Sequence, residues 1–267
     1  AGHRPRGGRH RDQAVTQPFF IVSSGRSGTA MLHKALSAVP GVEMHHEYAV
    51  QITQPLAVKR YLGAVSGDET RKLLDETFGA AVRHAQGTHW GDSSNKLSWL
   101  VPDLAALFPG ARFVHLVRDG RKVASSYFHK LGGETYDDRS NAVLQDWYDG
   151  KGSAPPPEKP YWWPVPRKNT PDAAAFRSYG QFERIAWHWA QINRIILAGL
   201  AALPPNRSLF VRLEDLRDSP SQVRALYEFL SLAYRDEDFA AFARPHNVNR
   251  PENRLLDAAQ RAQFDRI

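Results

Sequence analysis

The stretch "FFIVSSGRSGTAMLHKAL", residues 19–36, decides the fold class of this 267-residue chain. Phe19–Val22 is a short run of aromatic and β-branched residues, which is typical of a buried strand. A polar loop with two glycines follows at 23–28, and a helical pattern starts at Thr29. A strand, a glycine loop and a helix in this order direct backbone N–H groups and a helix N-terminus at one place. The stretch therefore predicts an anion-binding loop.

The loop differs from the two commonest nucleotide-binding patterns. It has neither G-x-x-x-x-G-K-[ST] nor G-x-G-x-x-G, because Gly25 and Gly28 are separated by two residues and no lysine follows directly. It still offers an oxyanion the planar donors of Arg26, the hydroxyls of Ser27 and Thr29, and close backbone approach at Gly28. As an alternative, the same residues form a tight strand-to-helix turn that binds nothing.

A second strand-to-helix unit, "RFVHLVRDGRKVASSYFHKL", lies at 112–131. Its apolar run ends at Val117, so Arg118 stands at the end of a strand, where open α/β sheets bind ligands. Ser126 and Lys130 follow on successive turns of the next helix. Arg, Ser and Lys in this arrangement suit a phosphate. Two anion sites, one per strand-to-helix crossing, predict a nucleotide with phosphates at both ends of its ribose.

Strands and helices alternate along the remaining chain, which indicates an α/β fold with a mainly parallel sheet. Helices are expected at about 29–39, 51–64, 68–84, 123–131, 176–203 and 221–232. The segment 132–172 differs, because it is rich in Gly, Asp and Pro and contains "YWWPVP". We expect an irregular insert here, serving as an acceptor lid that exposes Tyr161, Trp162 and Trp163 for stacking. Trp187 and Trp189 are expected in the core, with a pocket-lining role for one of them as the alternative.

Composition limits the classes of protein. Hydrophobic residues make up 42% of the chain, enough for one globular domain, and no apolar run approaches the roughly 20 residues of a membrane span, so we expect a soluble chain. The absence of Cys excludes disulfides, thiolate metal sites and a Cys nucleophile. Residues 1–12 carry four Arg and one Asp, hence +3 of the net charge of +7. We predict a basic, disordered arm at 1–17 and a single domain at 18–267.

The two motifs together resemble those of one family. "SSGRSGTAML" resembles the 5′-phosphosulfate loop of sulfotransferases, and "FVHLVRDGRKVASSYFHK" resembles their 3′-phosphate motif, including the spacing of Arg118 and Ser126. The resemblance runs from Pro18 through most of the chain and is closest to tyrosylprotein, glycan and bacterial sulfotransferases. It implies a P-loop-like three-layer fold, with helices on both faces of a mainly parallel sheet. It also implies the donor 3′-phosphoadenosine 5′-phosphosulfate (PAPS), whose two anionic groups match the two predicted sites.

The resemblance assigns residues to the donor. The 5′-phosphosulfate is expected at Arg26, Ser27, Gly28, Thr29 and Ala30, and the 3′-phosphate at Arg118, Ser126 and Lys130. Ala30 replaces the Thr or Ser that is usual there, so one hydroxyl contact is lost. "RPHNVNRPENR", residues 244–254, resembles a donor-covering loop, from which Arg250 or Asn249 reaches the 3′-phosphate.

The resemblance also assigns catalytic residues. Glu47, in "GVEMHHEYAV", falls where related enzymes carry a catalytic Glu, and Lys96 resembles the lysine that stabilises the leaving group. Arg26 adds positive charge beside the transferred group. A carboxylate base needs a pKa raised toward neutrality, whereas His46 and His45 have a suitable intrinsic pKa and stay open as alternatives. A metal site at 45–47 is disfavoured, because adjacent residues of an extended segment point to opposite faces.

We therefore predict a PAPS-dependent sulfotransferase that acts on the hydroxyl of a glycan, a small natural product or a tyrosine and releases 3′,5′-adenosine bisphosphate (PAP). No metal and no nucleic acid are expected. The alternatives are a P-loop kinase or other nucleotide-dependent phosphotransferase, and a non-catalytic nucleic-acid binder that uses the basic arm. The expected location is the bacterial cytoplasm, with the Golgi lumen as the alternative. The oligomeric state is not predicted.

Overall fold

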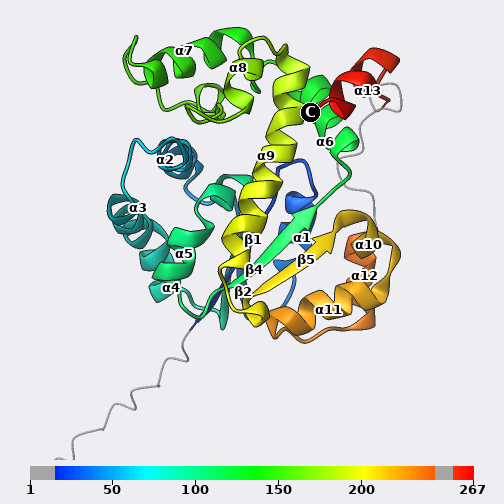
Figure 1. Cartoon of the computed structure of the whole chain (residues 1–267). Coiled ribbons are helices and arrows are strands. Elements are labelled where there is room, and N and C mark those ends of the chain that lie inside the picture. Colours follow the sequence, from blue (N-terminus) through cyan, green and yellow to red (C-terminus); the bar gives the residue numbers. More distant parts are fainter. Residues whose placement is uncertain (1–15, 244–254) are drawn as a thin grey trace, which may run out of the picture.

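The computed structural model describes residues 16–243 and 255–267 (Figure 1). Within them a single parallel sheet has the strand order β2-β3-β1-β4-β5. The strands are β1 (Gln17–Val22), β2 (Val42–His46), β3 (His89–Ser93), β4 (Arg112–Val117) and β5 (Ser208–Arg212). Because β1 lies in the middle and all pairings are parallel, the carboxyl ends of the strands share one edge. This edge is where the predicted motifs begin.

Helices follow the strands and fill both sides of the sheet. They are α1 (Thr29–Leu36), α2 (Val50–Leu62), α3 (Gly67–Leu74), α4 (Ala80–His84), α5 (Val101–Leu107), α6 (Gly120–Leu131), α7 (Asp138–Asp149), α8 (Asp172–Phe176), α9 (Gln181–Ala201), α10 (Leu213–Asp218), α11 (Pro220–Leu230), α12 (Phe239–Ala243) and α13 (Ala258–Asp265). A π-helical turn at Asp75–Gly79 joins α3 to α4, and 3-10 turns lie at Asn95–Trp99, Lys159–Tyr161, Pro205–Arg207 and Asp236–Asp238. None of the helices in the described ranges is long and apolar enough to cross a membrane.

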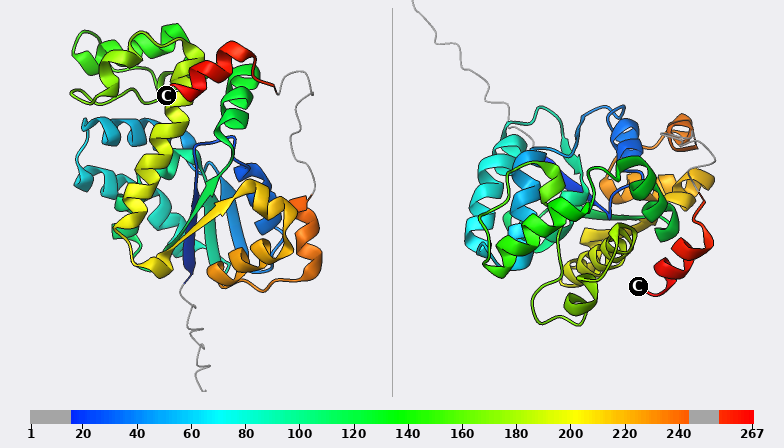
Figure 2. Two further views of the ribbon diagram at one scale, coloured as in Figure 1. Left: turned by 45° about the vertical axis from the view of Figure 1, so that its right-hand side comes forward. Right: turned by 90° about the horizontal axis from the view of Figure 1, so that it is seen from above.

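Burial of β1 on both faces produces the three layers. Phe20 and Val22 belong to a hydrophobic cluster with side chains of α2, α5 and α9, whereas Phe19 and Ile21 belong to a second cluster with α1, α11 and α12. Neighbouring strand residues point to opposite faces, so an unbroken apolar strand needs cover on both sides. Figure 2 shows α2–α5 on one side of the sheet and α10–α12 on the other. The predicted fold class is confirmed.

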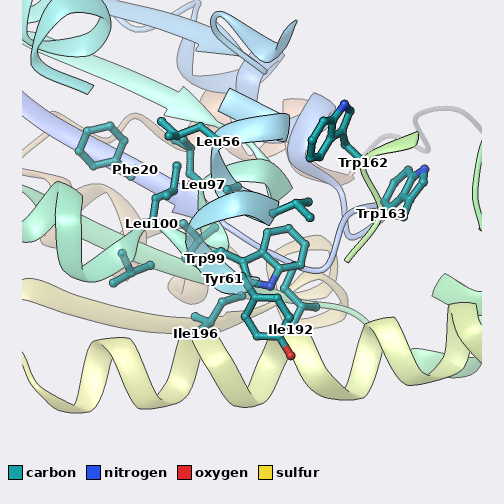
Figure 3. Close-up of a cluster of buried hydrophobic side chains, with 14 of the residues drawn as sticks. Phe20, Leu56, Tyr61, Leu97, Trp99, Leu100, Trp162, Trp163, Ile192 and Ile196 are labelled. Atoms are coloured by element: carbon teal, nitrogen blue, oxygen red, sulfur yellow. The ribbon is translucent and has the colours of Figure 1, made fainter. Parts of the chain in front are cut away.

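The insert at 132–172 departs from the prediction in two ways. It contains a regular helix, α7, and the two tryptophans expected to be exposed are buried, with 2% of Trp162 and 7% of Trp163 exposed. Each indole N–H donates to a backbone carbonyl, Trp162 to Pro156 at 2.6 Å and Trp163 to Glu134 at 2.7 Å. Figure 3 shows both rings among the side chains of the first cluster. The expectation of exposed stacking aromatics was wrong for these two residues, because their rings complete the core.

Candidate active site

Four strand ends bring the sequence-predicted residues to one edge of the sheet. The loop 23–28 follows β1, Glu47 follows β2, Lys96 lies in the turn after β3, and Arg118 follows β4. In parallel sheets this edge is the usual place for ligands, because successive loops converge there. α7 and α8 lie beyond the same edge (Figure 1).

The backbone conformation of the loop after β1 requires its two glycines. Gly25 has φ +81° and Gly28 has φ +102°, which residues with a Cβ rarely adopt. A Cβ at Gly28 would also lie 2.6 Å from Leu213 Cδ1. Ser27 Oγ donates to the carbonyl of Gly25 at 3.0 Å, so its hydroxyl stabilises the loop from inside. The loop is a backbone cradle that leads into the N-terminus of α1 at Thr29 and Ala30.

The two motifs meet through arginine side chains. Arg118 Nη1 donates to the carbonyl of Arg26 at 2.9 Å, and Arg26 Nε donates to Ser126 Oγ at 3.0 Å. Burial lowers the pKa of Arg118, an effect opposed by the Glu214 carboxylate. Trp189 donates its indole N–H to the carbonyl of Arg118 at 3.2 Å, so it stabilises the backbone directly after β4. The loops therefore present one basic surface, with the exposed Lys130 a turn beyond Ser126.

A buried network of polar side chains forms hydrogen bonds to the loop 23–28. This network was not predicted from the sequence. Ser24 O accepts the Tyr127 hydroxyl at 3.0 Å and the His188 Nε2 proton at 3.1 Å, and Asn95 Nδ2 donates to Tyr127 Oη at 3.2 Å. Burial lowers the pKa of His188 to about 3, so this imidazole is neutral. Tyr127 and Asn95 are the neighbours of Ser126 and Lys96 in the motifs, which is the one sequence signal for them; His188 has none.

Glu47 lies between two lysines. Its Oε2 pairs with Lys159 Nζ at 2.9 Å, and its Oε1 lies 3.8 Å from Lys96 Nζ. Burial alone would raise the pKa of the Glu47 carboxyl, but Lys96 and Lys159 outweigh it and the pKa is lowered. Glu47 therefore lacks the raised pKa that a carboxylate base needs while both lysines lie beside it. Lys159 comes from the insert and was not predicted.

Lys96 is enclosed rather than solvated. Only 4% of the residue is exposed, and its Nζ lies 4.5 Å from the ring centre of Trp163. Burial lowers the pKa of Lys96 to about 8, while the Glu47 carboxylate opposes the shift. Lys96 is therefore fixed in place, and it binds its proton less tightly than a solvated lysine does.

The end of β3 holds the turn that carries Glu47. Tyr48 N–H donates to Asp92 Oδ1 at 3.2 Å, and Glu47 N–H donates to Ser93 O at 3.2 Å. Asp92 is fully buried, and its Oδ2 has no hydrogen-bond partner within the described residues. Burial raises the pKa of Asp92 to about 7. Asp92 was also absent from the sequence-based prediction.

The two alternative bases point to opposite faces, as expected for adjacent strand residues. His45 lies against Trp90, with ring centres 5.0 Å apart, and its Nε2 is 3.1 Å from Glu43 Oε1. His46 is exposed, and its Nδ1–H donates to Ser93 O at 2.7 Å. Across 16–243 and 255–267, no group of three His, Asp or Glu side chains is placed to hold a metal ion. Arg250 and Asn249 lie outside the described residues, as does the arm through residue 15.

Comparison with known proteins agrees with this arrangement. The sequence pattern of the sulfotransferase family matches residues 18–151, half of the chain. This chain belongs to the sulfotransferase family. The match contains both motifs that are predicted to bind anions, together with Glu47 and Lys96. No curated protein matches the sulfotransferase sequence significantly.

Solved structures include proteins that are similar to this sulfotransferase. The sulfotransferase domain from the Synechococcus PCC 7002 olefin synthase matches with a TM-score of 0.50 and 16% identity, over 96% of this chain and 90% of that one. The sulfotransferase domain from the curacin biosynthetic pathway gives 0.49 and 16%, over 86% and 79%. The sulfotransferase from Alicyclobacillus acidocaldarius gives 0.49 and 18%, over 82% and 83%. At such low identity the first of these supports the fold alone.

Proposed function

We propose that this sulfotransferase transfers the sulfuryl group of PAPS to an acceptor hydroxyl by in-line displacement, with Glu47 as general base and PAP as product. The observation that carries the proposal is the contact of Arg26 with Ser126 and of Arg118 with the Arg26 carbonyl, because it joins the two predicted anion-binding loops into one site. The acceptor is a glycan, a small natural product or a tyrosine. Action in the bacterial cytoplasm remains part of the proposal.

The residues present fit such a donor. A Cβ at Gly25 would collide with the Tyr127 hydroxyl and a Cβ at Gly28 with Leu213, so both glycines are needed for the backbone that leads into the α1 N-terminus, where an anion would bind. Arg118 and Ser126 would hold the 3′-phosphate, since a guanidinium and a hydroxyl are both donors to phosphate oxygens. Arg26 and the backbone from Ser27 to Ala30 would hold the 5′-phosphosulfate.

The chain contributes charge and a base. PAPS supplies an activated sulfuryl group with a phosphate as its leaving group. Lys96 and Arg26 would offset the negative charge that develops at that end. Glu47 would accept the proton of the acceptor hydroxyl. His46, one residue away and exposed, is the alternative base.

Calorimetry with PAP tests the donor assignment. Wild-type protein, Arg118→Ala and a matched control, Arg83→Ala on α4, are titrated with PAP and separately with ATP and Mg²⁺. Removing a charged hydrogen-bond donor costs about 1.5–3 kcal/mol, so we expect Arg118→Ala to weaken PAP binding roughly 10- to 100-fold. Arg83 pairs with Asp75 far from the loops, and its variant should bind PAP like wild type.

The result separates the alternatives. Binding of ATP with Mg²⁺ in place of PAP would favour a phosphotransferase. Equal PAP affinity in wild type and Arg118→Ala would remove the 3′-phosphate assignment. Binding of neither nucleotide would overturn the proposed function.

A further inference from the structure

Both carboxylate oxygens of Glu47 are engaged by ammonium groups. Lys159 Nζ takes Oε2 at 2.9 Å, and Lys96 Nζ faces Oε1 at 3.8 Å. A general base must accept a hydrogen bond from the hydroxyl that it deprotonates. A carboxylate can accept several hydrogen bonds, so the hydroxyl can reach Glu47 with both lysines in place, but the lysines lower the pKa of the base and the departure of one would strengthen it.

Lys96 is the lysine that stays. It is enclosed, and its ammonium lies over the Trp163 ring. Lys159 is the mobile partner, because 45% of its side chain is exposed and the aliphatic stem has four rotatable bonds. Its backbone is fixed, since the buried Gln54 donates to the carbonyls of Lys159 at 3.1 Å and Trp162 at 2.8 Å. The Lys159 side chain can thus change rotamer while its backbone stays in place near Glu47.

Water can solvate an exposed ammonium that leaves a carboxylate, but a second anion would favour the departure. The charged and titratable groups that interact with Glu47 are Lys96, Lys159, His46 and the buried Asp92 and Tyr127. Asp92 is fully buried, and in the proposed function the anionic groups of PAPS lie at Arg26, Lys96 and Arg118, so an anion for Lys159 would come with the acceptor. A neutral acceptor brings no such anion.

We infer that the acceptor carries a carboxylate close to the hydroxyl that is sulfated, and that Lys159 recognises this carboxylate. The inference rests on the proposed function and deepens it by naming the acceptor class. Lys159 is then the specificity-determining residue of the insert. When the Lys159 side chain pairs with the acceptor carboxylate, Glu47 loses its ion pair and the pKa of the Glu47 carboxyl rises. Acceptor binding and activation of the base are coupled through one side chain.

Matched acceptors test the inference. Sulfuryl transfer from labelled PAPS is measured to 4-nitrophenyl β-D-glucuronide against the β-D-glucoside, and to 3-hydroxybenzoate against 3-hydroxybenzyl alcohol. The proteins are wild type, Lys159→Gln and the control Lys151→Gln, which alters another lysine of the insert, paired with Asp149. We expect wild type to favour the acidic member of a pair at least tenfold in kcat/KM. Lys159→Gln should bring the ratio near one, whereas Lys151→Gln should leave it unchanged.

Three results would overturn the inference. These are a preference for the neutral members, a ratio that Lys159→Gln does not alter, and no transfer to either acidic probe. PAP binding is measured on the same preparations. Normal PAP binding with any of these results removes the acceptor assignment and leaves the donor assignment standing, whereas loss of PAP binding by wild type means that the proposed function itself is wrong.

Discussion

Backbone strain marks individual residues of the candidate site. Arg26, Glu47 and Ala49 have φ between +49° and +56°, which costs residues with a Cβ roughly 1–3 kcal/mol each. Surrounding contacts must hold such conformations. Ser93 and Asp92 accept the backbone N–H groups of Glu47 and Tyr48 and so fix the turn. The position of the proposed base thus depends on a second carboxyl group below it.

Asp92 makes stability depend on pH in an identifiable way. Its pKa is about 7 in the folded protein and about 3.9 in an unfolded chain. Between these values the folded state binds more protons than the unfolded state, so stability falls as pH rises through this window. Asp92→Asn keeps the acceptor for Tyr48 N–H and removes the charge. We expect the free energy of unfolding of the variant, relative to wild type, to rise by roughly 1–4 kcal/mol between pH 4.5 and pH 8. Urea denaturation at both pH values measures it.

Asp149→Asn is the matched control for Asp92→Asn. Arg177 and Lys151 hold the pKa of the Asp149 carboxyl below its usual value. Its contribution therefore has the opposite sign, and this variant should lose stability relative to wild type as pH rises from about 2 toward 5. A difference for Asp92→Asn that stays flat across pH 4.5–8 would mean that Asp92 titrates normally and is not the buried acid described above.

Site residues that lie within a sequence motif could be predicted, whereas contacts between residues far apart in the sequence could not. Arg26, Arg118 and Ser126 belong to two recognisable loops, and the structure brings them together. Lys159 is 112 residues away from Glu47 in the sequence, and it lies in a segment without a motif. A contact of that separation depends on how the insert packs, which periodicity does not report.

At the scale of elements, the loop after β1 needs glycine for two separate reasons. Gly25 and Gly63 both have φ +81°, but a Cβ at Gly25 would collide with the Tyr127 hydroxyl and lie 2.8 Å from Asn95 Nδ2, while Gly63 faces open space. Substitutions at Gly25 and Gly63 therefore separate the cost of the positive φ from the cost of the collision.

Gly25→Ala should damage stability and donor binding together. We expect a loss of about 3 kcal/mol or more in the free energy of unfolding and a PAP affinity at least tenfold lower, because Tyr127 must release Ser24. Gly63→Ala should cost only about 1 kcal/mol and leave PAP binding unchanged. Urea denaturation and calorimetry measure both. Equal effects of the two variants would show that the contact with Tyr127 is unimportant.

Elements with strong apolar patterns were predicted well, and weakly patterned ones were missed. The predicted strand at Arg112–Val117 has the same bounds in the structure. The helix expected at 176–203 begins only at Gln181, because Gly180 is its N-cap and the short α8 ends at Phe176. α7 escaped prediction because Ser140 and Leu144 are its buried positions, too few for a helical period.

At the scale of the whole molecule, the insert and the sheet share one core. Trp162 and Trp163 belong to the same hydrophobic cluster as Phe20 of β1 (Figure 3). Further hydrogen bonds tie the insert to the domain: Gln54 Nε2 donates to Trp162 O at 2.8 Å, and Arg167 Nε donates to Tyr61 O. These contacts support an insert that folds with the domain, and movement is then left to side chains such as Lys159.

Truncation of Trp162 tests whether the insert belongs to the cooperative unit. Removing a fully buried aromatic ring costs about 3–5 kcal/mol, so Trp162→Ala should lower the free energy of unfolding by that amount while unfolding stays a single transition. Phe210→Ala is the control, since that ring on β5 is 58% exposed and its loss should cost about 0.5 kcal/mol or less. Urea denaturation followed by far-UV circular dichroism and fluorescence measures both variants. If the insert were a separate mobile lid, Trp162→Ala would resemble Phe210→Ala, or the two signals would report different midpoints. Coincident transitions with a large loss for Trp162→Ala alone would place the lysine that pairs with Glu47 on a segment as stable as the sheet.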